Sequence, residues 1–200
     1  MKLLTYMIFI FSIGCNSRNK AVVNIKKDSI AYELIKDNLY HDIAGNLYFR
    51  VMDMSNPEKP VSRYLSIVWN ANQCDSINGG KMLLKDVVDA KSFEKILGFY
   101  YRDKNRFYIF NEMSDGGTFA VLNEIDFSSF KVLSNYYAKD KNNVYYKSNV
   151  ISQADIPTFK VFPKILNGDT LWQYAKDKNH YYSFGDIIPD SELKLYELNE

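Results

Sequence analysis

The sequence predicts a mostly β fold made of repeated β-hairpins, with a turn and three short strands in each repeat, in one elongated or curved domain with few short helices. Two observations lead to this prediction. Tyrosine and phenylalanine, which favour strands, account for 16 and 13 of the 200 residues. The tripeptide Asp-Lys-Asn begins at residues 103, 140 and 177, an equal spacing, and aromatic residues flank every copy.

The first 15 residues, MKLLTYMIFIFSIGC, are typical of a secretory signal. Lys2 precedes an apolar stretch that is too short for a membrane-spanning helix, which needs about 20 residues. The stretch ends in Ser12-Ile13-Gly14-Cys15 and resembles the bacterial lipobox, although the lipobox usually has Leu, Val or Ile where Ser12 stands. The resemblance implies cleavage before Cys15 and acylation of its thiol. An ordinary signal peptide with an incidental cysteine is the alternative.

This interpretation divides the chain into a signal peptide (1–14), a flexible tether (15–29) and a single repeat domain (30–200). The tether is polar with a small apolar centre. Acyl chains on Cys15 would attach the protein to a membrane of the bacterial cell envelope. Asn16 replaces the Asp of the inner-membrane retention signal, which favours the outer membrane.

Composition excludes several classes of function. Lys and Arg total 25 against 24 Asp and Glu, a net charge of +1, so no nucleic-acid partner is expected. Two cysteines and two histidines cannot form a disulfide framework, a thiolate zinc site or a three-histidine centre, and we expect no metal and no cofactor. Cys74 is interpreted as a loop or half-buried thiol without a role, with a redox or nucleophilic cysteine as the alternative.

Each Asp-Lys-Asn copy is expected to be the turn of a hairpin. Lys-Asn suits a tight turn, because Asn tolerates positive φ and the Asp carboxylate accepts bonds from the backbone two residues on. If the loop is two residues, Ala138 faces Tyr145 and Tyr174 faces Ser183; a longer loop would shift this register. Tyrosines recur three residues before and five residues after each Asp: Tyr100, Tyr137, Tyr174 and Tyr108, Tyr145, Tyr182.

A second motif, Asp-x-x-Ser/Thr-Phe, alternates with the first at residues 89–93, 126–130 and 155–159. It is expected to form one helical turn, capped by its Asp, before a third strand. Residues 40–50 are interpreted as a degenerate first copy of the hairpin, 63–69 as a strand and 82–97 as a region with a short helix. Residues 190–198 are interpreted as a truncated Asp-x-x unit that closes the stack.

The chain resembles the DKNYY repeat family of bacterial secreted and lipid-anchored proteins. The resemblance is carried by residues 137–146 (YAKDKNNVYY) and 154–161 (ADIPTFKV), with similar residues at 99–108 and 174–182. It covers residues 88–198 well and 39–87 poorly. It implies an architecture and no activity, because the family has none assigned.

The recurring motifs each allow a structural and a functional interpretation. The Asp-Lys-Asn copies are read as turns rather than cation sites, because each Asp precedes a Lys. The six recurring tyrosines are core residues or, alternatively, a binding face. His41 and His180 are expected to be exposed rather than catalytic. No nucleophile or phosphate-loop motif occurs, and a glycosidase carboxylate pair is defined in space rather than by spacing.

The sequence therefore predicts a non-catalytic, lipid-anchored envelope protein that acts as a binding or scaffold module for a protein or glycan ligand. An envelope hydrolase acting on glycans through a carboxylate pair is the first alternative. A toxin-neutralising immunity lipoprotein is the second.

Overall fold

The computed structural model describes residues 30–70 and 80–196. The described residues from Ala31 onward belong to one compact unit. The expected signal peptide, the tether, Cys15 and Cys74 lie outside the described residues.

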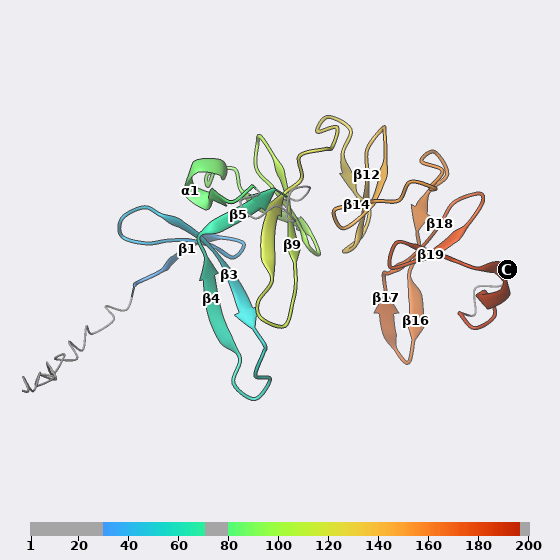
Figure 1. Cartoon of the computed structure of the whole chain (residues 1–200), viewed down its shortest axis with the longest axis horizontal. Helices are drawn as coiled ribbons and strands as arrows, with labels where there is room; N and C mark the ends of the chain where they lie inside the picture. The colour runs from blue at the N-terminus through green and yellow to red at the C-terminus, as the bar shows by residue number, and fades with distance from the viewer. Residues whose placement is uncertain (1–29, 71–79, 197–200) are drawn as a thin grey trace, which may run out of the picture. The chain divides into compact units, whose positions relative to one another are not determined.

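The described chain is mostly β and forms five sheets, of which four each contain a four-stranded antiparallel meander and the fifth is a two-stranded hairpin (Figure 1). The first comprises β1 (Glu33–Lys36), β2 (Leu39–His41), β3 (Leu47–Asp53) and β4 (Val61–Leu65). The second comprises β7 (Glu94–Leu97), β8 (Tyr100–Arg102), β9 (Phe107–Asn111) and β10 (Thr118–Val121), extended by β5 (Ile67–Asn70) and β6 (Met82–Leu83). We call these meanders, with the turns that precede them, the first to fourth repeats.

The third sheet comprises β11 (Lys131–Val132), β12 (Tyr137–Lys139), β13 (Val144–Tyr146) and β14 (Asn149–Val150). The fourth comprises β15 (Lys160–Val161), β18 (Tyr174–Lys176), β19 (Tyr181–Ser183) and β20 (Asp186–Ile188). A separate hairpin of β16 (Lys164–Leu166) and β17 (Asp169–Leu171) is inserted after β15. Helical structure in the described residues is limited to α1 (Leu84–Val87) and the 3₁₀ turn η1 (Asp190–Glu192).

The hairpin register matches the two-residue loop. Ala138 pairs with Tyr145, and Tyr174 pairs with Ser183. Residues 40–50 form a hairpin as expected, with Gly45 at φ +79° in the turn. Each repeat contains the three predicted strands and a fourth one. In the second, third and fourth repeats the fourth strand is two to four residues long, which is too short to show the alternation of apolar and polar residues that would predict a strand.

One expectation about residues 63–97 needs correction. Residues 63–69 do not form one strand, because the strand is interrupted at Ser66, and β4 and β5 belong to different sheets. β5 instead runs parallel to β10. The short helix expected within 82–97 is present as the single turn α1, because Val88 already has extended backbone angles and residues 94–97 form the strand β7.

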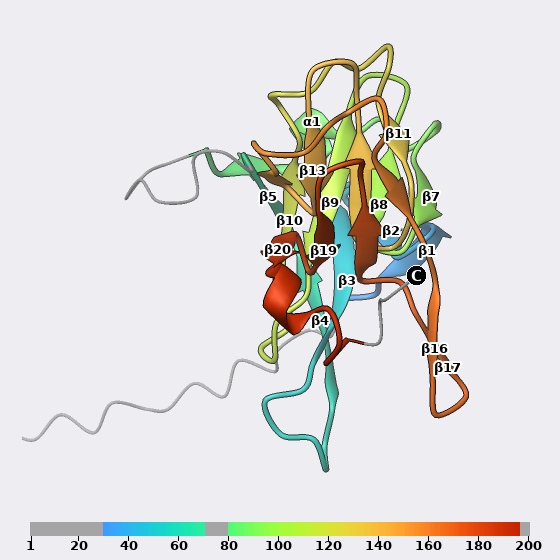
Figure 2. The same ribbon diagram turned by 90° about the vertical axis from the view of Figure 1, so that its right-hand side faces the viewer.

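The repeats pack face to face in chain order. Successive residues of a strand point to opposite faces, so every internal sheet is buried on both sides. In the third repeat, Ala138 and Tyr145 pack toward the second repeat, and Tyr137 and Val144 pack toward the fourth. We call these the N-side and C-side faces. The hydrophobic clusters join neighbouring repeats, and no cluster of described residues joins the first repeat to the fourth. The sheets follow one another from left to right in Figure 1, and Figure 2 looks along this series, so that they lie one behind another.

Tyrosine hydroxyls connect one repeat to the backbone of the next. The Tyr100 hydroxyl lies 2.9 Å from the Tyr136 carbonyl and 3.1 Å from the Lys147 carbonyl of the third repeat. The Tyr137 hydroxyl donates to the Gln173 carbonyl of the fourth repeat at 2.8 Å and accepts from the Gly185 N–H at 3.0 Å. The tyrosine three residues before Asp-Lys-Asn thus specifies how the next repeat docks.

A last turn covers the C-side face of the fourth repeat. The backbone N–H groups of Leu195 and Tyr196 donate to the Glu192 carbonyl, as those of Thr158 and Phe159 donate to Asp155. The Tyr196 ring lies 6.3 Å from the Tyr174 ring, the separation seen between Phe130 and Tyr100. The C-terminal segment is therefore a turn of the expected kind, with Glu192 rather than Asp190 in the leading position.

The contact between repeats can be tested with two glycines that share a backbone conformation. Gly185 and Gly168 both have φ +90°, where a side chain costs about 1–2 kcal/mol. A Cβ at Gly185 would lie 2.6 Å from the Tyr146 Cβ of the third repeat, whereas a Cβ at Gly168 meets nothing within 4 Å. Gly185→Ala should lower the free energy of unfolding by about 1–3 kcal/mol more than Gly168→Ala in urea titrations. Equal losses would show that this turn does not hold the two repeats together.

Candidate functional site

The Asp of each Asp-Lys-Asn copy is the centre of a hydrogen-bond network. In the third repeat, Asp140 Oδ1 accepts the backbone N–H groups of Asn142 (2.7 Å) and Asn143 (2.8 Å). Asp140 Oδ2 accepts the Asp126 N–H (2.8 Å) and lies 2.8 Å from the Tyr145 hydroxyl. One buried carboxylate therefore closes the hairpin turn and connects it to the Asp-x-x-Ser/Thr-Phe turn.

The two motifs are joined a second time by the lysine and the hydroxyl residue. The Lys141 backbone N–H donates to Ser129 Oγ at 3.0 Å, and Lys141 Nζ pairs with Asp126 Oδ2 at 2.7 Å. Ser129 Oγ itself donates to Asp126 Oδ1 at 2.7 Å. We call the whole arrangement the aspartate clasp. Its members in the second and fourth repeats are Asp89, Ser92, Asp103, Lys104, Tyr108 and Asp155, Thr158, Asp177, Lys178, Tyr182.

The first repeat contains a partial clasp that sequence comparison locates poorly. Asp42 Oδ1 accepts the N–H groups of Ala44 and Asn46, each at 2.9 Å, and Oδ2 lies 3.0 Å from the Tyr48 hydroxyl. Asp42 and Tyr48 are separated by six residues rather than five, because this turn is one residue longer. The contact between the Asp carboxylate and the Tyr hydroxyl is therefore kept in this longer turn, although the changed spacing makes it hard to recognise in the sequence.

The clasp sets the protonation state of its members. Burial raises the pKa of the Asp140 carboxyl, but hydrogen bonds from the Asp126 backbone and the Tyr145 hydroxyl outweigh it and leave the pKa below its ordinary value. Asp177 behaves in the same way, with burial opposed by the Asp155 backbone. Burial, followed by the hydrogen bond to Asp140, raises the pKa of Tyr145 to about 12.

These contacts favour the turn interpretation of the Asp-Lys-Asn copies. Both oxygens of Asp140 accept hydrogen bonds from the protein, and Lys141 lies beside the neighbouring carboxylate. Among the described residues no group of three or more His, Cys, Asp or Glu side chains has the geometry of a metal site.

The six recurring tyrosines are core residues, which corrects the alternative that they form a binding face. Their exposed fractions range from 0 to 7%. Those before the Asp pack on C-side faces (Tyr100, Tyr137, Tyr174), and those after it pack on N-side faces with their hydroxyls on the clasp (Tyr108, Tyr145, Tyr182). Their rings are covered by neighbouring sheets and by the last turn, so they present no surface to a ligand.

The histidines lie beside turns and are half-buried. His41 Nδ1 lies 3.0 Å from the Asp42 carbonyl, and Nε2 lies 3.5 Å from Glu33 Oε2. His180 Nδ1 lies 3.5 Å from the Tyr182 hydroxyl and 4.0 Å from Asp177 Oδ1. The structure does not bring the two histidines together, since they belong to the first and fourth repeats.

A different set of tyrosines forms a surface on the first repeat. The Tyr32 and Tyr64 rings stack at 3.8 Å, Tyr48 meets Tyr32 edge-on at 4.9 Å, and Tyr40 meets Tyr64 edge-on at 5.2 Å. All four side chains are half-buried, and no hydrophobic cluster of described residues includes them. We call this surface the tyrosine face. It lies on the N-side of the first sheet, opposite the core residues Leu39 and Phe49.

The spacing of these four residues concealed the tyrosine face. Tyr40 and Tyr48 pair across β2 and β3, and Tyr64 comes from β4 opposite Arg50. Only the strand register of the first repeat, where the sequence motif is degenerate, places them together. The sequence offered one indication of the tyrosine face: each of three strands in this poorly matching repeat carries a tyrosine.

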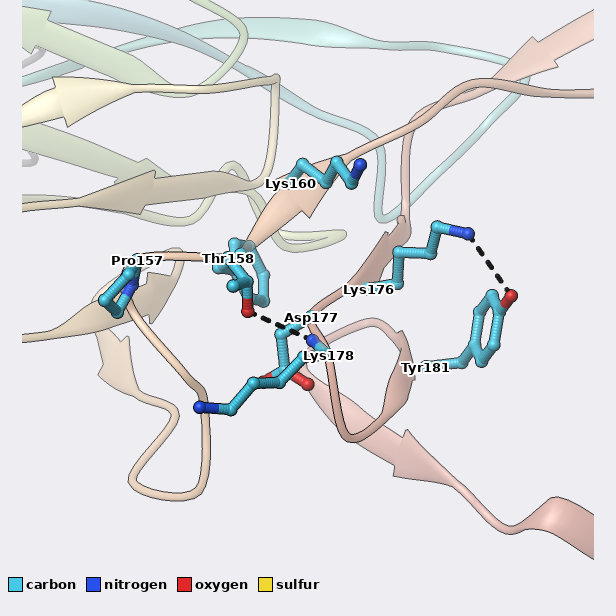
Figure 3. A pocket seen from close by; sticks show the side chains of 8 residues that line it. Pro157, Thr158, Lys160, Lys176, Asp177, Lys178 and Tyr181 are labelled. Carbon is cyan, nitrogen blue, oxygen red and sulfur yellow. Dashed lines mark hydrogen bonds between the residues drawn. The ribbon is translucent and has the colours of Figure 1, made fainter.

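A groove of about 690 Å³ opens on the fourth repeat (Figure 3). Lys160, Lys176 and Tyr181 line it together with members of the clasp. Asp177 belongs to the lining, but its side chain is 0% exposed because the clasp encloses it. The exposed charge in the groove is therefore carried by lysine.

The clasp is expected to depend on the tyrosine hydroxyl. Tyr145→Phe should lower the free energy of unfolding by about 1.5–3 kcal/mol, because Asp140 loses a hydrogen bond to its charged form in a buried site. Tyr146→Phe on the same strand is the control: no hydrogen bond within the described chain reaches its hydroxyl, and its effect should stay within about 0.5 kcal/mol. Urea unfolding followed by fluorescence measures both. Similar losses for the two variants would contradict the assigned role of Tyr145.

Stability should also depend on pH in a defined direction. Asp140 and Asp177 have lowered pKa values in the fold, so their stabilisation is present above the unfolded value of about 3.9 and is lost as the pH falls through the folded values. Tyr145 acts at the other limit: its contribution is complete below about pH 10 and is lost as the pH rises toward about 12. The free energy of unfolding measured across pH tests both limits. If the free energy of unfolding falls as steeply at low pH in Asp140→Asn as in the unmodified chain, Asp140 does not contribute to the loss of stability in acid.

Comparison with known proteins agrees with this architecture. A family model, the DKNYY family, matches residues 5–149, 117–186 and 137–199. Comparisons with curated proteins and with solved structures find no match. The matched family is not a known enzyme family. Since the match spans nearly the whole chain, the protein belongs to the DKNYY family.

Proposed function

We propose that this protein is a non-catalytic, lipid-anchored binding module of the bacterial cell envelope, and that it holds a protein or glycan ligand on the tyrosine face. The tyrosine face carries this proposal. Tyrosine offers a large apolar ring and a hydroxyl that bonds to polar groups, a combination favoured at recognition surfaces.

The position of the tyrosine face supports a role in recognition. In the second, third and fourth repeats the N-side face is covered by the preceding repeat, through clusters that include Tyr108, Tyr145 and Tyr182. Tyr48 occupies the corresponding place in the first repeat and remains half-buried. The tyrosine face is thus built like an interface between repeats, but it ends the series of described sheets.

The carboxylates support a non-catalytic role. A glycosidase general acid needs a raised pKa so that it is protonated when it acts. The described carboxyl groups whose pKa departs from its ordinary value are all shifted downward: Asp42, Asp53, Asp89, Asp126, Asp140, Asp155 and Asp177. For Asp89, the hydrogen bond from Lys104 is the largest cause and lowers the pKa to about 2. These carboxylates suit structural hydrogen bonds and ion pairs rather than proton transfer.

The anchor is supported by the sequence alone. The apolar stretch that ends at Cys15 resembles a lipoprotein signal, and a lipid there would hold the repeats at a membrane surface, with the outer membrane favoured. Within residues 30–70 and 80–196 no helix has the length and apolar character needed to cross a bilayer.

Removing the acylation site tests the anchor. Cys15→Ser should release the protein from the membrane fraction and abolish fatty-acid labelling, because the thiol is the expected attachment point. Labelling of the native host with a radioactive fatty acid, followed by fractionation, measures both. Labelling retained by Cys15→Ser would refute the anchor without bearing on the tyrosine face.

Crosslinking in native envelopes tests the tyrosine face. Tyr64→Ala removes the ring that contacts both Tyr32 and Tyr40, and it should reduce capture of the ligand about tenfold, the effect of a contact residue worth roughly 1.4 kcal/mol. Trp172→Ala is the control, since Trp172 is an aromatic residue of the fourth repeat that is 39% exposed. Circular dichroism checks that both variants fold. Undiminished capture by folded Tyr64→Ala would contradict the proposal.

A further inference from the structure

The strand β4 has a free edge within the described part of the chain. It is the last strand of the first sheet, and among the described strands only β3 pairs with it. With five residues it is the longest strand at the edge of any described sheet, and its register contains no bulge. Proteins usually protect such an edge with a charge, a bulge or a covering segment, because it can pair with another chain.

The backbone groups of Ser62 and Tyr64 point to this free edge. The Arg50 N–H donates to the Asn38 carbonyl at 2.8 Å, so Arg50 uses its backbone groups on the β2 side. Tyr64 is the register partner of Arg50, and Ser62 lies two residues away on β4. Because hydrogen-bonded and non-hydrogen-bonded pairs alternate along an antiparallel ladder, the N–H and C=O groups of Ser62 and Tyr64 point away from β3. No hydrogen bond from another described residue reaches them.

The next outward position on this edge is already paired. The Leu84 N–H donates to the carbonyl of Ser66, two residues beyond Tyr64, at 2.9 Å. Since Leu83 is the register partner of Ile67, this bond extends the antiparallel pairing of β5 and β6 to the end of β4. The helix α1 then begins at Leu84 and takes the chain out of the ladder. The free edge of β4 therefore continues a line along which the fold already pairs strands.

The charge on β4 does not protect the edge. Arg63 Nη1 lies 3.6 Å from Asp53 Oδ2 and donates to the Asp115 carbonyl of the second repeat, so the side chain is held by other elements. The edge strands β1 and β7, each four residues long, both contain a register irregularity. An irregularity of this kind disrupts the ladder and discourages pairing with another chain. β4 lacks this protection.

Two surfaces beside the edge can receive the side chains of an added strand. The first is the tyrosine face, to which β4 contributes Tyr64. The second is a groove of about 250 Å³ at the end of β4, lined by Tyr64, Leu65 and Trp69 among others. Lys81 is the charged residue of this lining, and its Nζ lies 4.6 Å from the centroid of the Trp69 ring. Successive side chains of a strand point to opposite faces, so one short segment can contact both surfaces.

We propose that the ligand of the tyrosine face is an extended peptide segment of a protein, which pairs with β4 as a fifth strand of the first sheet. This inference rests on the proposed binding role of the tyrosine face. Main-chain bonds to Ser62 and Tyr64 supply affinity, and side-chain contacts supply specificity. The peptide residue opposite Tyr64 places its side chain on the tyrosine face, because register partners share a side of the sheet. A glycan has no row of N–H and C=O groups to match this edge.

Hydrogen exchange with a selected peptide tests the pairing. A displayed library of random decapeptides is selected against the full chain in detergent micelles, and exchange is followed by NMR. Bound peptide should slow exchange of the Ser62 and Tyr64 amides at least about tenfold, because their N–H groups gain acceptors. The Arg63 amide, which faces β3, is the internal control and should change little. A selection without binders, or binders that leave the Ser62 and Tyr64 amides unprotected, would overturn the proposal.

A proline tests the main-chain bonds directly. Ser62→Pro removes an N–H that points to the free edge and leaves the ladder between β3 and β4 intact, a position where edge strands tolerate proline. It should weaken binding of the selected peptide at least about tenfold. Ser62→Ala is the matched control: it also removes the hydroxyl that accepts from Arg50 Nε at 3.1 Å, but it keeps the N–H, so binding should change less than about twofold. Equal affinities of the two variants, both folded by circular dichroism, would contradict strand addition.

Capture of the native ligand by crosslinking in envelopes separates this inference from the proposed function. Reduced capture by both Tyr64→Ala and Ser62→Pro supports strand addition at the tyrosine face. Reduced capture by Tyr64→Ala alone shows that the face holds a ligand of another kind, such as a glycan, and overturns strand addition only. Undiminished capture by both variants overturns the proposed function together with the inference. A dimer of this chain that Ser62→Pro dissociates would assign the edge to a second copy and overturn the proposed partner.

Discussion

One buried aspartate in each repeat holds the architecture together. In the second to fourth repeats this aspartate accepts four hydrogen bonds, from its own turn, from the preceding Asp-x-x-Ser/Thr-Phe turn and from a tyrosine hydroxyl: Asp103, Asp140 and Asp177. A buried carboxylate is costly unless its oxygens are bonded, so each contact makes the others necessary. This requirement explains why the two motifs alternate: neither is complete without the other.

The clasp leaves both faces of each short sheet free to be apolar, and this determines how the repeats assemble. Strands of two to five residues cannot form an independent core, so each internal sheet is covered on its N-side and C-side faces by its neighbours. At the C-terminal end, Tyr196 covers the face that holds Tyr174. At the other end, the tyrosine face replaces the apolar core residues with amphipathic ones.

The site proposed for function lies where a repeat departs from the common pattern, since the tyrosine face belongs to the first repeat, whose motif is degenerate. Periodicity predicted the Ala138–Tyr145 register and the burial of Tyr100 and Tyr137, because recurring residues keep recurring environments. It did not locate the tyrosine face, because a departure from the pattern has no second copy for comparison.

The sequence by itself determined the β-repeat architecture, the turn positions, the family and the expectation of an anchor at Cys15. These follow from local chemistry: residues that suit turns and strands, repeated at fixed separations. Only the tertiary structure decided that Asp126 and Asp140 share one network, that Tyr32 and Tyr64 stack, and that Lys160 faces Lys176. Each of these pairs is distant in sequence and is brought together by strand register and by the stacking of sheets.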